Sequence, residues 1–362
     1  MGSSVLYHLS RRGIPALGLD RSSPPHSLGS THGQSRVIRE AYYEHPLYVP
    51  LVRRAYQCWR DLEEQSGKSI YHQTGGLMLG RPDGPVISGS MASAVEHGIA
   101  HRMLSADEVR AKLPGFAPPD DFVGLWEERA GFLAPETAIA ANLELASRHN
   151  ARVRMGTPIL GWTAGPNAVR VQTTDGSFSA RVLVLTLGAW IGKLLGPAGQ
   201  LFEVERQLSH WFKPRVDASG WPVALWEHRP GGLIYSIPEG GNRVKAGIHH
   251  EGDIVDPDLV ERNVSPQDDA TIRSLIEQFQ PGAAGELLNS AVCLYTNTPD
   301  RHFVIDWHPD HANVLIVSPC SGHGFKFSSA IGEVVADLVT GRESPFDLSF
   351  FAIGRFDGGM PR

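Results

Sequence analysis

The chain has 362 residues, of which 41% are hydrophobic and 20% are charged, and its formal net charge at pH 7 is −6. This balance is typical of a globular protein large enough for two domains, and it gives no indication of nucleic-acid binding. No apolar run approaches the roughly 18 residues that a transmembrane helix needs, and the N-terminus lacks the features of a signal peptide. We therefore expect a cytoplasmic protein without membrane contact. The three cysteines, Cys58, Cys293 and Cys320, lie far apart, which argues against a disulfide framework or a zinc site.

The first twenty residues, MGSSVLYHLSRRGIPALGLD, have the pattern of the second half of a dinucleotide-binding β-α-β unit. Such a unit has a G-x-G-x-x-G motif whose third glycine lets helix and strand pack closely, and an acid about 20 residues later binds a ribose hydroxyl. Gly2 and Asp20 match these two positions. The strand and the two glycines that should precede Gly2 are missing from the sequence. We therefore expect a nucleotide-binding domain that lacks its first strand, and weak cofactor binding by this form.

The next part of the chain alternates loops, helices and strands. A polar loop at residues 22–36 is followed by a predicted helix at 47–62, where apolar residues recur at helical spacing. The segment QTGGLMLG at 73–80 predicts a strand bounded by glycines. Ser105 begins a capping box, SADE, that opens a short helix, and a further helix is expected at 135–149.

From residue 151 the apolar residues recur with period two, which indicates strands. Asp175 and Gly176 form the expected turn of a hairpin, and a final apolar strand at 182–187 runs into Gly188. A strand that ends on a glycine before a new helix resembles the second place where the chain of a flavoprotein passes its cofactor.

The middle of the chain, residues 202–295, contains short alternating segments separated by proline and glycine, with one predicted helix at 266–279. The C-terminal part returns to two strands, a glycine-rich SGHG turn and a helix at 325–339. We therefore predict an α/β fold of the two-lobed α+β kind. A Rossmann-like lobe built from separated pieces joins a second lobe with a mixed, largely antiparallel sheet.

His32, Arg36 and Arg39 follow the polar loop at intervals of four and three residues. If the segment is helical, this spacing places all three near one face. An ordinary solvated basic stretch explains the spacing equally well.

Lys245 and His249 lie four apart in the predicted strand RVKAGIHH and so point to the same side of it. A lysine that points inward from a sheet is costly unless it has a partner or a task. Metal binding by His249 and His250 is disfavoured, because adjacent strand residues face opposite ways and no carboxylate or H-E-x-x-H motif completes a site. We expect no metal.

Cys293 alternates with Ala291 and Tyr295 on one face of its predicted strand. Taken alone, this position favours a buried and inert cysteine. Lys326 lies in the first turn of the C-terminal helix, where a structural helix favours Asp or Glu. The open N–H groups of that turn and the lysine together suit an anion.

These segments together resemble the monomeric sarcosine oxidase family of FAD-dependent amine oxidases, within the D-amino-acid oxidase superfamily. The family includes N-methyltryptophan and pipecolate oxidases. The similarity runs nearly end to end, from MGSSVLYHLSRRG through GSTHGQSRVIR, LTLGAW and AVCLYTNTPD to SGHGFKFSSAIGE. Several motifs in the right order are specific for the family and much less so for the substrate.

The resemblance implies FAD as the cofactor, carried covalently by Cys293 through an 8α-thioether. The helix N-terminus before Phe325 would stabilise negative charge on the flavin. His32 and Arg36 match residues that lie against the flavin ring. The other positions that would contact the cofactor are Gly2, Asp20, Gly188, Gly322, Gly324 and Phe325.

The resemblance also implies the amine-binding and catalytic residues. Arg39 and Lys326 match the pair that grips the substrate carboxylate. Lys245 matches the lysine that promotes attack of oxygen on reduced flavin. The residues that would line the amine pocket are His249, Tyr235 and Tyr295.

The implied reaction is oxidation of a secondary amine, such as sarcosine, N-methyltryptophan or pipecolate, to an imine or aldehyde product with release of hydrogen peroxide. The expected partners are the small amine and molecular oxygen, and a monomer is expected. Thr31 replaces a second histidine found in some members, the HGQSR segment is closer to the pipecolate type, and Trp226 is expected to reshape the pocket. These differences leave the substrate open.

Two alternatives fit parts of the sequence. The first is an N-terminally truncated, non-catalytic remnant of the family that cannot hold FAD, although the intact downstream motifs favour a misassigned start over decay. The second is an NAD-dependent dehydrogenase, which shares the first motif but has no use for Cys293 or Lys326.

The resemblance also predicts the domain boundaries. The FAD-binding domain would comprise residues 1–70, 145–203 and 296–362. The substrate domain would comprise residues 71–144 and 204–295.

Overall fold

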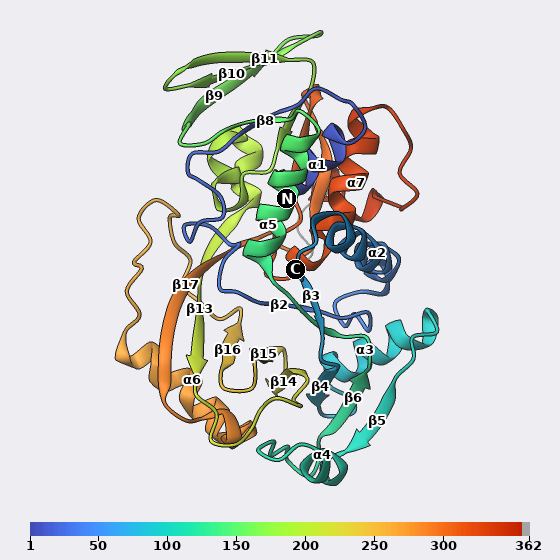
Figure 1. Cartoon of the computed structure of the whole chain (residues 1–362), viewed down its shortest axis with the longest axis vertical. Helices are drawn as coiled ribbons and strands as arrows, with labels where there is room; N and C mark the ends of the chain where they lie inside the picture. The colour runs from blue at the N-terminus through green and yellow to red at the C-terminus, as the bar shows by residue number, and fades with distance from the viewer. Residues whose placement is uncertain (357–362) are drawn as a thin grey trace.

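The computed structural model describes residues 1–356 of the chain. Figure 1 shows two parts stacked along the long axis, with small sheets and most long helices in the upper part and one large sheet in the lower part. This mixed α/β architecture, with largely antiparallel sheets, confirms the predicted fold class at that level. Within residues 1–356, no helix is long and apolar enough to cross a membrane.

The helices agree closely with the sequence pattern. They are α1 (Gly2–Ser10), α2 (Val49–Ser66), α3 (Pro85–Glu96), α4 (Ala106–Lys112), α5 (Pro135–Arg148), α6 (Pro266–Phe279) and α7 (Ser328–Val339). The capping box predicted at Ser105 is present, with the Ser105 side chain accepting from the backbone N–H of Glu108. The predicted C-terminal helix begins as a 3-10 turn, Phe325–Phe327, before α7.

The upper part contains the helix and strand that the sequence predicts for the first twenty residues. Strand β1 (Leu17–Leu19) pairs in parallel with β8 (Arg152–Arg154), and α1 packs against α5 and α7. Strand β12 (Leu183–Leu185) pairs in parallel with β19 (His311–Ser318), which pairs antiparallel with β18 (Val304–His308). A third small sheet is a meander of β9 (Ile159–Ala164), β10 (Val169–Thr173) and β11 (Gly176–Ala180).

The lower part is organised by an eight-stranded sheet in the order β17-β13-β16-β15-β14-β4-β6-β5. Every neighbouring pair is antiparallel except β14 with β4. In chain order the strands are β4 (Gly76–Gly80), β5 (Arg102–Ser105), β6 (Val123–Glu127), β13 (Glu203–Phe212), β14 (Val223–Arg229), β15 (Gly232–Pro238), β16 (Val244–His249) and β17 (Leu287–Asn297).

The structure decides one alternative that the sequence left open and corrects one local prediction. Residues 32–39, whose spacing would have suited a helix, are not helical, because Arg36–Ile38 forms β2, which pairs with β7 (Gly131–Leu133) beside β3 (Tyr71–Gln73). The strand predicted at 73–80 is two strands, since the chain turns at Gly75 with φ 75°. A Cβ at Gly75 would lie 2.7 Å from the Trp126 ring, so this turn requires glycine.

The expectation that Trp226 reshapes the pocket is also wrong. Trp226 is 0% exposed and packs in the core behind the large sheet, where its ring lies 5.5 Å from Phe116 and 5.7 Å from Phe279. It alternates with Leu225 along β14, and only Leu225 lines the central cavity. Trp226 therefore does not shape the pocket. The domain boundaries stay a prediction, and residues 357–362 of the first domain lie outside the described residues.

Candidate active site

A cavity of about 1110 Å³ lies between the two parts of the molecule. Ordinary small-molecule pockets measure roughly 300–1,000 Å³, so this one has room for a dinucleotide together with a small substrate. His32 is the one predicted site residue that does not line it. The predicted residues that do are Gly2, Asp20, Arg36, Arg39, Gly188, Tyr235, Lys245, His249, Cys293, Tyr295, Gly322, Gly324, Phe325 and Lys326.

The large sheet forms one wall of this cavity. Because side chains alternate along a strand, Lys245 and His249 of β16 both face the cavity, as the sequence predicts. His249 Nδ1 lies 3.1 Å from Tyr295 Oη, and Tyr235 Oη lies 3.2 Å from Ser209 Oγ. Burial lowers the pKa of His249 well below its usual value and raises the pKa of both tyrosines. At neutral pH this wall therefore presents a neutral imidazole and two phenol groups.

Lys245 is held by backbone carbonyls. It is 1% exposed, and its Nζ donates to Gly33 O at 2.9 Å and to Ser35 O at 3.0 Å. The Trp211 ring lies 5.5 Å from the same atom. Burial, followed by the nearby Arg36 guanidinium, lowers the pKa of Lys245 to about 7. An ammonium group has three N–H donors, so one remains for a ligand in the cavity.

Cys293 lies in β17 opposite Gln207, and its thiol reaches the cavity. Its Sγ is 3.6 Å from an Arg36 guanidinium nitrogen and 3.6 Å from Ser30 O. Burial opposes ionisation of the thiol, but contact with His32 and the charges of Arg36 and Lys245 lower the pKa of Cys293 to about 7.

The other two cysteines differ in this respect. Burial raises the pKa of Cys58 to about 12 and also raises the pKa of Cys320. Cys293 alone among the three cysteines thus has the chemistry of a nucleophilic thiol.

Arg39 lies directly after β2 and is 2% exposed. Its guanidinium donates to Glu44 Oε2 at 2.6 Å and to Ala41 O at 2.7 Å. The rings of Tyr42 and Tyr43 lie 4.4 Å and 4.7 Å from its guanidinium carbon. Glu44, which the sequence did not single out, therefore neutralises one of the two cations expected to bind a carboxylate.

Lys326 lies near Arg39, in the 3-10 turn before α7. Its Nζ donates to His323 O at 2.9 Å and to Tyr42 Oη at 3.3 Å. Burial and then the Arg39 charge lower the pKa of Lys326 to about 7, against the opposing effect of Glu44. At neutral pH this lysine is therefore close to losing its charge.

A hydrogen-bonded chain fixes Tyr42 beneath Lys326. His323 Nε2 lies 3.1 Å from Arg301 O, which can only accept, so the other ring nitrogen is unprotonated. Tyr42 Oη then donates to His323 Nδ1 at 2.6 Å and keeps a lone pair for Lys326. Burial lowers the pKa of His323 to about 3, so this neutral form persists through the physiological range.

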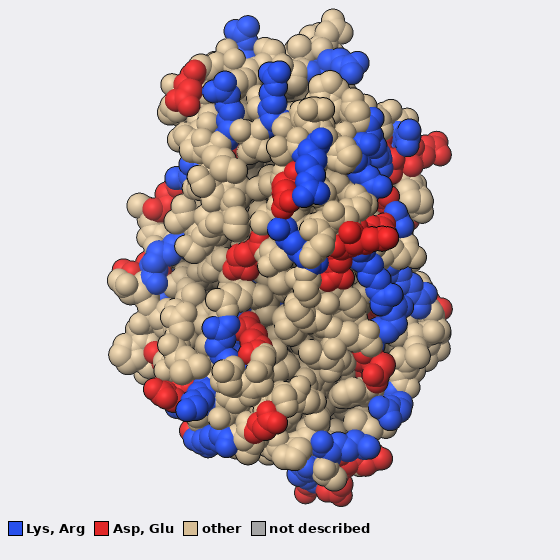
Figure 2. All heavy atoms as spheres, viewed as in Figure 1, with Lys and Arg blue, Asp and Glu red and all other residues tan. Residues whose placement is uncertain are grey.

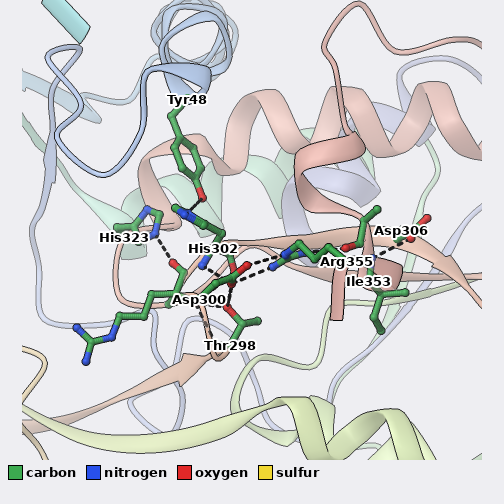
Figure 3. Close-up of polar contacts among 11 residues, drawn as sticks. Tyr48, Thr298, Asp300, His302, Asp306, His323, Ile353 and Arg355 are labelled. Atoms are coloured by element: carbon green, nitrogen blue, oxygen red, sulfur yellow. Dashed lines mark hydrogen bonds and ion pairs between the residues drawn. The ribbon is translucent and has the colours of Figure 1, made fainter. Parts of the chain in front are cut away.

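The C-terminal segment supports the same region, as Figure 3 shows. Arg355 donates to the two carboxylate oxygens of Asp300 at 2.7 Å and 3.1 Å. Asp300 also accepts from the backbone N–H of His302 at 3.0 Å, and the His302 ring lies 3.1 Å from Tyr48 Oη. Arg301, whose backbone carbonyl accepts a hydrogen bond from His323 Nε2, lies within this turn. The Arg355–Asp300 pair therefore helps to place the chain of contacts that ends at Lys326.

The other end of the cavity has the features expected around a nucleotide. Helix α1 begins at Gly2 and has no side chain capping its N-terminus, so its first N–H groups are free to meet an anion. A Cβ at Gly2 would lie 2.8 Å from Thr186 Oγ1, which explains the glycine by close packing. Asp20 follows β1, accepts from the backbone N–H of Ser22 at 2.8 Å and lines the cavity.

Two buried hydroxyl groups lie in the cavity wall without a protein partner among residues 1–356. These are Ser30 Oγ and Thr296 Oγ1. Buried polar groups are normally hydrogen-bonded, so a bound ligand with polar atoms would satisfy them. In the same described range, no group of three or more His, Cys, Asp or Glu side chains is placed to hold a metal ion.

A family model described as FAD dependent oxidoreductase, DAO, matches residues 1–338. The chain belongs to the DAO family. It is therefore an FAD-dependent oxidoreductase, and FAD is the ligand for which the large cavity, the uncapped helix and the unpartnered hydroxyl groups are suited.

Individual relatives within the DAO family narrow the type. Monomeric sarcosine oxidase of Streptomyces avermitilis is 38% identical over 347 residues, covering 93% of this chain and 90% of that protein. N-methyl-L-tryptophan oxidase of Yersinia pestis is 32% identical and covers 98% and 96%. The structure of L-proline dehydrogenase from P. horikoshii superposes with a TM-score of 0.86 at 20% identity, covering 99% and 96%, which shows the fold alone. The chain is thus a DAO-family enzyme of the sarcosine oxidase type.

Several residues of this DAO-family site could not be found from the sequence. Glu44, Tyr42 and His323 contact the two carboxylate-binding candidates, yet none belongs to a spacing pattern that indicates chemistry. The one available signal was Glu44 itself, an acid five residues after Arg39. Figure 2 shows side chains of both signs intermixed on the face it views, so that face has no single-sign patch that would indicate a charged partner.

Proposed function

We propose that this chain oxidises secondary amines that carry a carboxylate, such as the N-methyl or cyclic amino acids sarcosine, N-methyltryptophan and pipecolate. The products are an imine, which hydrolyses, and hydrogen peroxide. The observation that carries the proposal is the presence of two buried cations, Arg39 and Lys326, in the wall of a cavity that also contains Lys245 and Cys293. Buried cations without full neutralisation are costly and are retained where they bind an anion.

Cys293 is the proposed point of covalent flavin attachment. Its thiol ionises near neutral pH and lies beside Arg36, so a thiolate is available inside the cavity. Arg36 would lie against the flavin ring, while His32, which does not line the cavity, contacts the attachment thiol of Cys293. Gly322 and Gly324 would let the turn before Phe325 approach it closely, since Gly322 has φ 79°. The flavin, when bound, accepts a hydride equivalent from the amine and returns the electrons to oxygen.

The protein's own contribution to amine oxidation is binding, orientation and proton control. Arg39 and Lys326 would hold the substrate carboxylate, with Arg39 exchanging its contact with Glu44 for part of that role. The same positive charge disfavours a protonated amine, so the substrate binds with its nitrogen neutral. His249, Tyr235 and Tyr295 would surround the amine with a neutral imidazole and phenol hydroxyl groups.

Lys245 would serve the second half of the reaction, in which oxygen takes up electrons. Its free N–H faces the cavity, and a fixed cation there stabilises negative charge that develops on oxygen. We also propose that the chain acts as a monomer, which the name of its monomeric sarcosine oxidase relatives supports.

A peroxide assay tests the proposal. Protein purified with FAD is given sarcosine, N-methyltryptophan, pipecolate and proline, and each is paired with an amine of the same shape that lacks the carboxylate. Peroxide release with at least one carboxylate substrate and much less with its partner is expected. No peroxide with any of them contradicts the proposed substrate class.

A further inference from the structure

A buried carboxylate, Glu239, lies one layer behind Lys245. Its side chain is 8% exposed and follows the end of β15. One oxygen, Oε1, accepts from Ser35 Oγ at 2.5 Å, and the other, Oε2, accepts from Trp211 Nε1 at 3.0 Å. Arg243 approaches Oε2 to 2.7 Å from the solvent side.

Ser35 and Trp211, the two residues that donate to Glu239 from the protein interior, also contact Lys245. The carbonyl of Ser35 accepts from Lys245 Nζ at 3.0 Å, and the Trp211 ring lies 5.5 Å from the same nitrogen. The loop that carries Ser35 is tight, since Gly33 has φ 93° and a Cβ there would lie 3.1 Å from Lys245 Nζ. Movement of Glu239 would therefore shift the Ser35 carbonyl and the Trp211 ring, which are two of the contacts that position the Lys245 ammonium group.

The charges around Lys245 require such a carboxylate. Arg36 Nη1 donates to Ser35 O at 2.8 Å, so two cations share one carbonyl oxygen. The charged and titratable groups that act on Lys245 are Arg36, Glu239, Cys293 and Glu136. Glu136 is engaged on the far side of the loop, where it accepts from the backbone N–H of Gly33 at 2.7 Å.

We propose that Glu239 is a positioning residue for the oxygen-reducing step. By accepting from the Ser35 hydroxyl and the Trp211 indole N–H, it fixes the two residues whose carbonyl and ring contact Lys245. Its negative charge keeps this lysine protonated beside Arg36. The inference rests on the role given to Lys245 in the proposed function, and it adds a residue that touches neither amine nor oxygen.

Glu239→Gln tests this, because glutamine keeps the shape of the side chain and removes its charge. In flavin-loaded protein with ¹³C-labelled lysine, the Lys245 resonance is identified by its loss in Lys245→Met. Its titration midpoint is expected to move to lower pH by about one unit in Glu239→Gln. The direction follows because loss of a nearby negative charge makes the ammonium form less stable.

The second readout is reoxidation of photochemically reduced, flavin-loaded protein, which needs no amine substrate. With the protonated lysine as the active form, a midpoint lowered from about 7 to about 6 reduces its protonated fraction at pH 7, and Glu239→Gln slows reaction with oxygen about fivefold at that pH. As the pH rises, the reoxidation rate of Glu239→Gln begins to fall at a lower pH than the reoxidation rate of the wild type. Anaerobic reduction of the flavin by an amine substrate stays within about twofold of the wild-type rate.

Two matched variants separate charge from placement. Ser35→Ala removes one contact of Glu239 but no charge, so it should slow reoxidation without moving the Lys245 midpoint. Arg243→Gln removes the cation on the solvent side, so the midpoint should move to higher pH, the opposite direction from Glu239→Gln.

Two results would overturn the proposal. One is an unchanged Lys245 midpoint with unchanged reoxidation in Glu239→Gln. The other is an equal loss in the reductive and oxidative reactions, which would indicate only structural damage. Failure of the wild type to oxidise any amine would contradict the proposed function and would still leave the titration and the photoreduction test able to judge Glu239.

Discussion

Replacing Lys326 by methionine removes a buried charge from the proposed carboxylate site while keeping a side chain of similar length. Lys326 is 6% exposed, so its interaction with a bound carboxylate is largely desolvated. Removing one partner of a buried, hydrogen-bonded charge pair costs about 2–5 kcal/mol. Arg39 remains in Lys326→Met and still attracts the anion, which places the expected loss near the lower end. Since 1.4 kcal/mol is tenfold, we expect kcat/KM for a carboxylate substrate to fall about a hundredfold.

The assay compares two substrates of one shape, pipecolate and piperidine, in steady-state peroxide production. Lys326→Met should show this fall in kcat/KM with pipecolate and keep whatever activity the wild type has on piperidine. Lys112→Met, which removes an exposed lysine of α4, is the control and should match the wild type. An equal loss of activity on both substrates would contradict a carboxylate-binding role for Lys326, because the lysine would then act on something other than the carboxylate.

The pH dependence gives an independent check of the same residue. The pKa of Lys326 is lowered to about 7, so the wild type should bind the carboxylate well below that pH and progressively less well above it. KM for pipecolate, corrected for ionisation of the amine itself, should therefore rise with pH through about 7. In Lys326→Met this rise should be absent.

The remaining predictions concern attachment and stability. Cys293→Ser should release all of its flavin on denaturation, whereas the wild type retains it; retention by the variant would contradict the attachment site. Arg355→Gln should lower the free energy of unfolding by about 1–2 kcal/mol, because it breaks a partly buried ion pair that donates to both Asp300 oxygens. The folded-state pKa of Asp300 is lowered to about 2, so this contribution is present above its unfolded pKa of 3.8 and disappears as pH falls toward 2, which denaturation at several pH values would measure. Trp226→Ala should cost about 3–5 kcal/mol in urea unfolding by opening a cavity in the core behind the large sheet, next to Phe116 and Phe279, with little change in KM.

Local sequence signals predicted much of the fold because they act over a few residues. The helix α4 begins after Ser105, whose side chain accepts from Glu108 N–H, a capping box readable from four letters. The period-two pattern of β16 placed Lys245 and His249 on one face, and both do line the cavity. In each case the deciding interaction lies within the segment itself.

The failures came from contacts between distant segments. Residues 32–39 have spacing compatible with a helix, but the backbone of Arg36–Ile38 pairs with Gly131–Leu133, about a hundred residues later. The expectation that Trp226 reshapes the pocket rested on its position nine residues before Tyr235, a predicted pocket residue. On adjacent strands, however, Trp226 pairs with Ile234, and its side chain points to the opposite face of the sheet from Tyr235.

The residues of the candidate site likewise fall into those that the sequence predicted and those that only the folded structure brings together. Resemblance between motifs identified Cys293 and Lys326, and their surroundings fit the expected chemistry. The groups that set the charge of these residues, such as Glu44 and Glu239, had no motif of their own. The Tyr42–His323 contact joins residues 281 positions apart, and only the folded structure brings them together.

In the proposed reaction one cavity holds a flavin, an amine with its carboxylate on Arg39 and Lys326, and a lysine for oxygen. Anaerobic mixing of the flavin-loaded protein with pipecolate, sarcosine, N-methyltryptophan and proline, followed by the flavin absorbance, tests this arrangement. We expect bleaching by at least one of them, reversal when oxygen is admitted, and no comparable bleaching by the same amine without its carboxylate. Flavin that stays oxidised with every substrate, or that is bleached equally by the carboxylate-free amine, would contradict it.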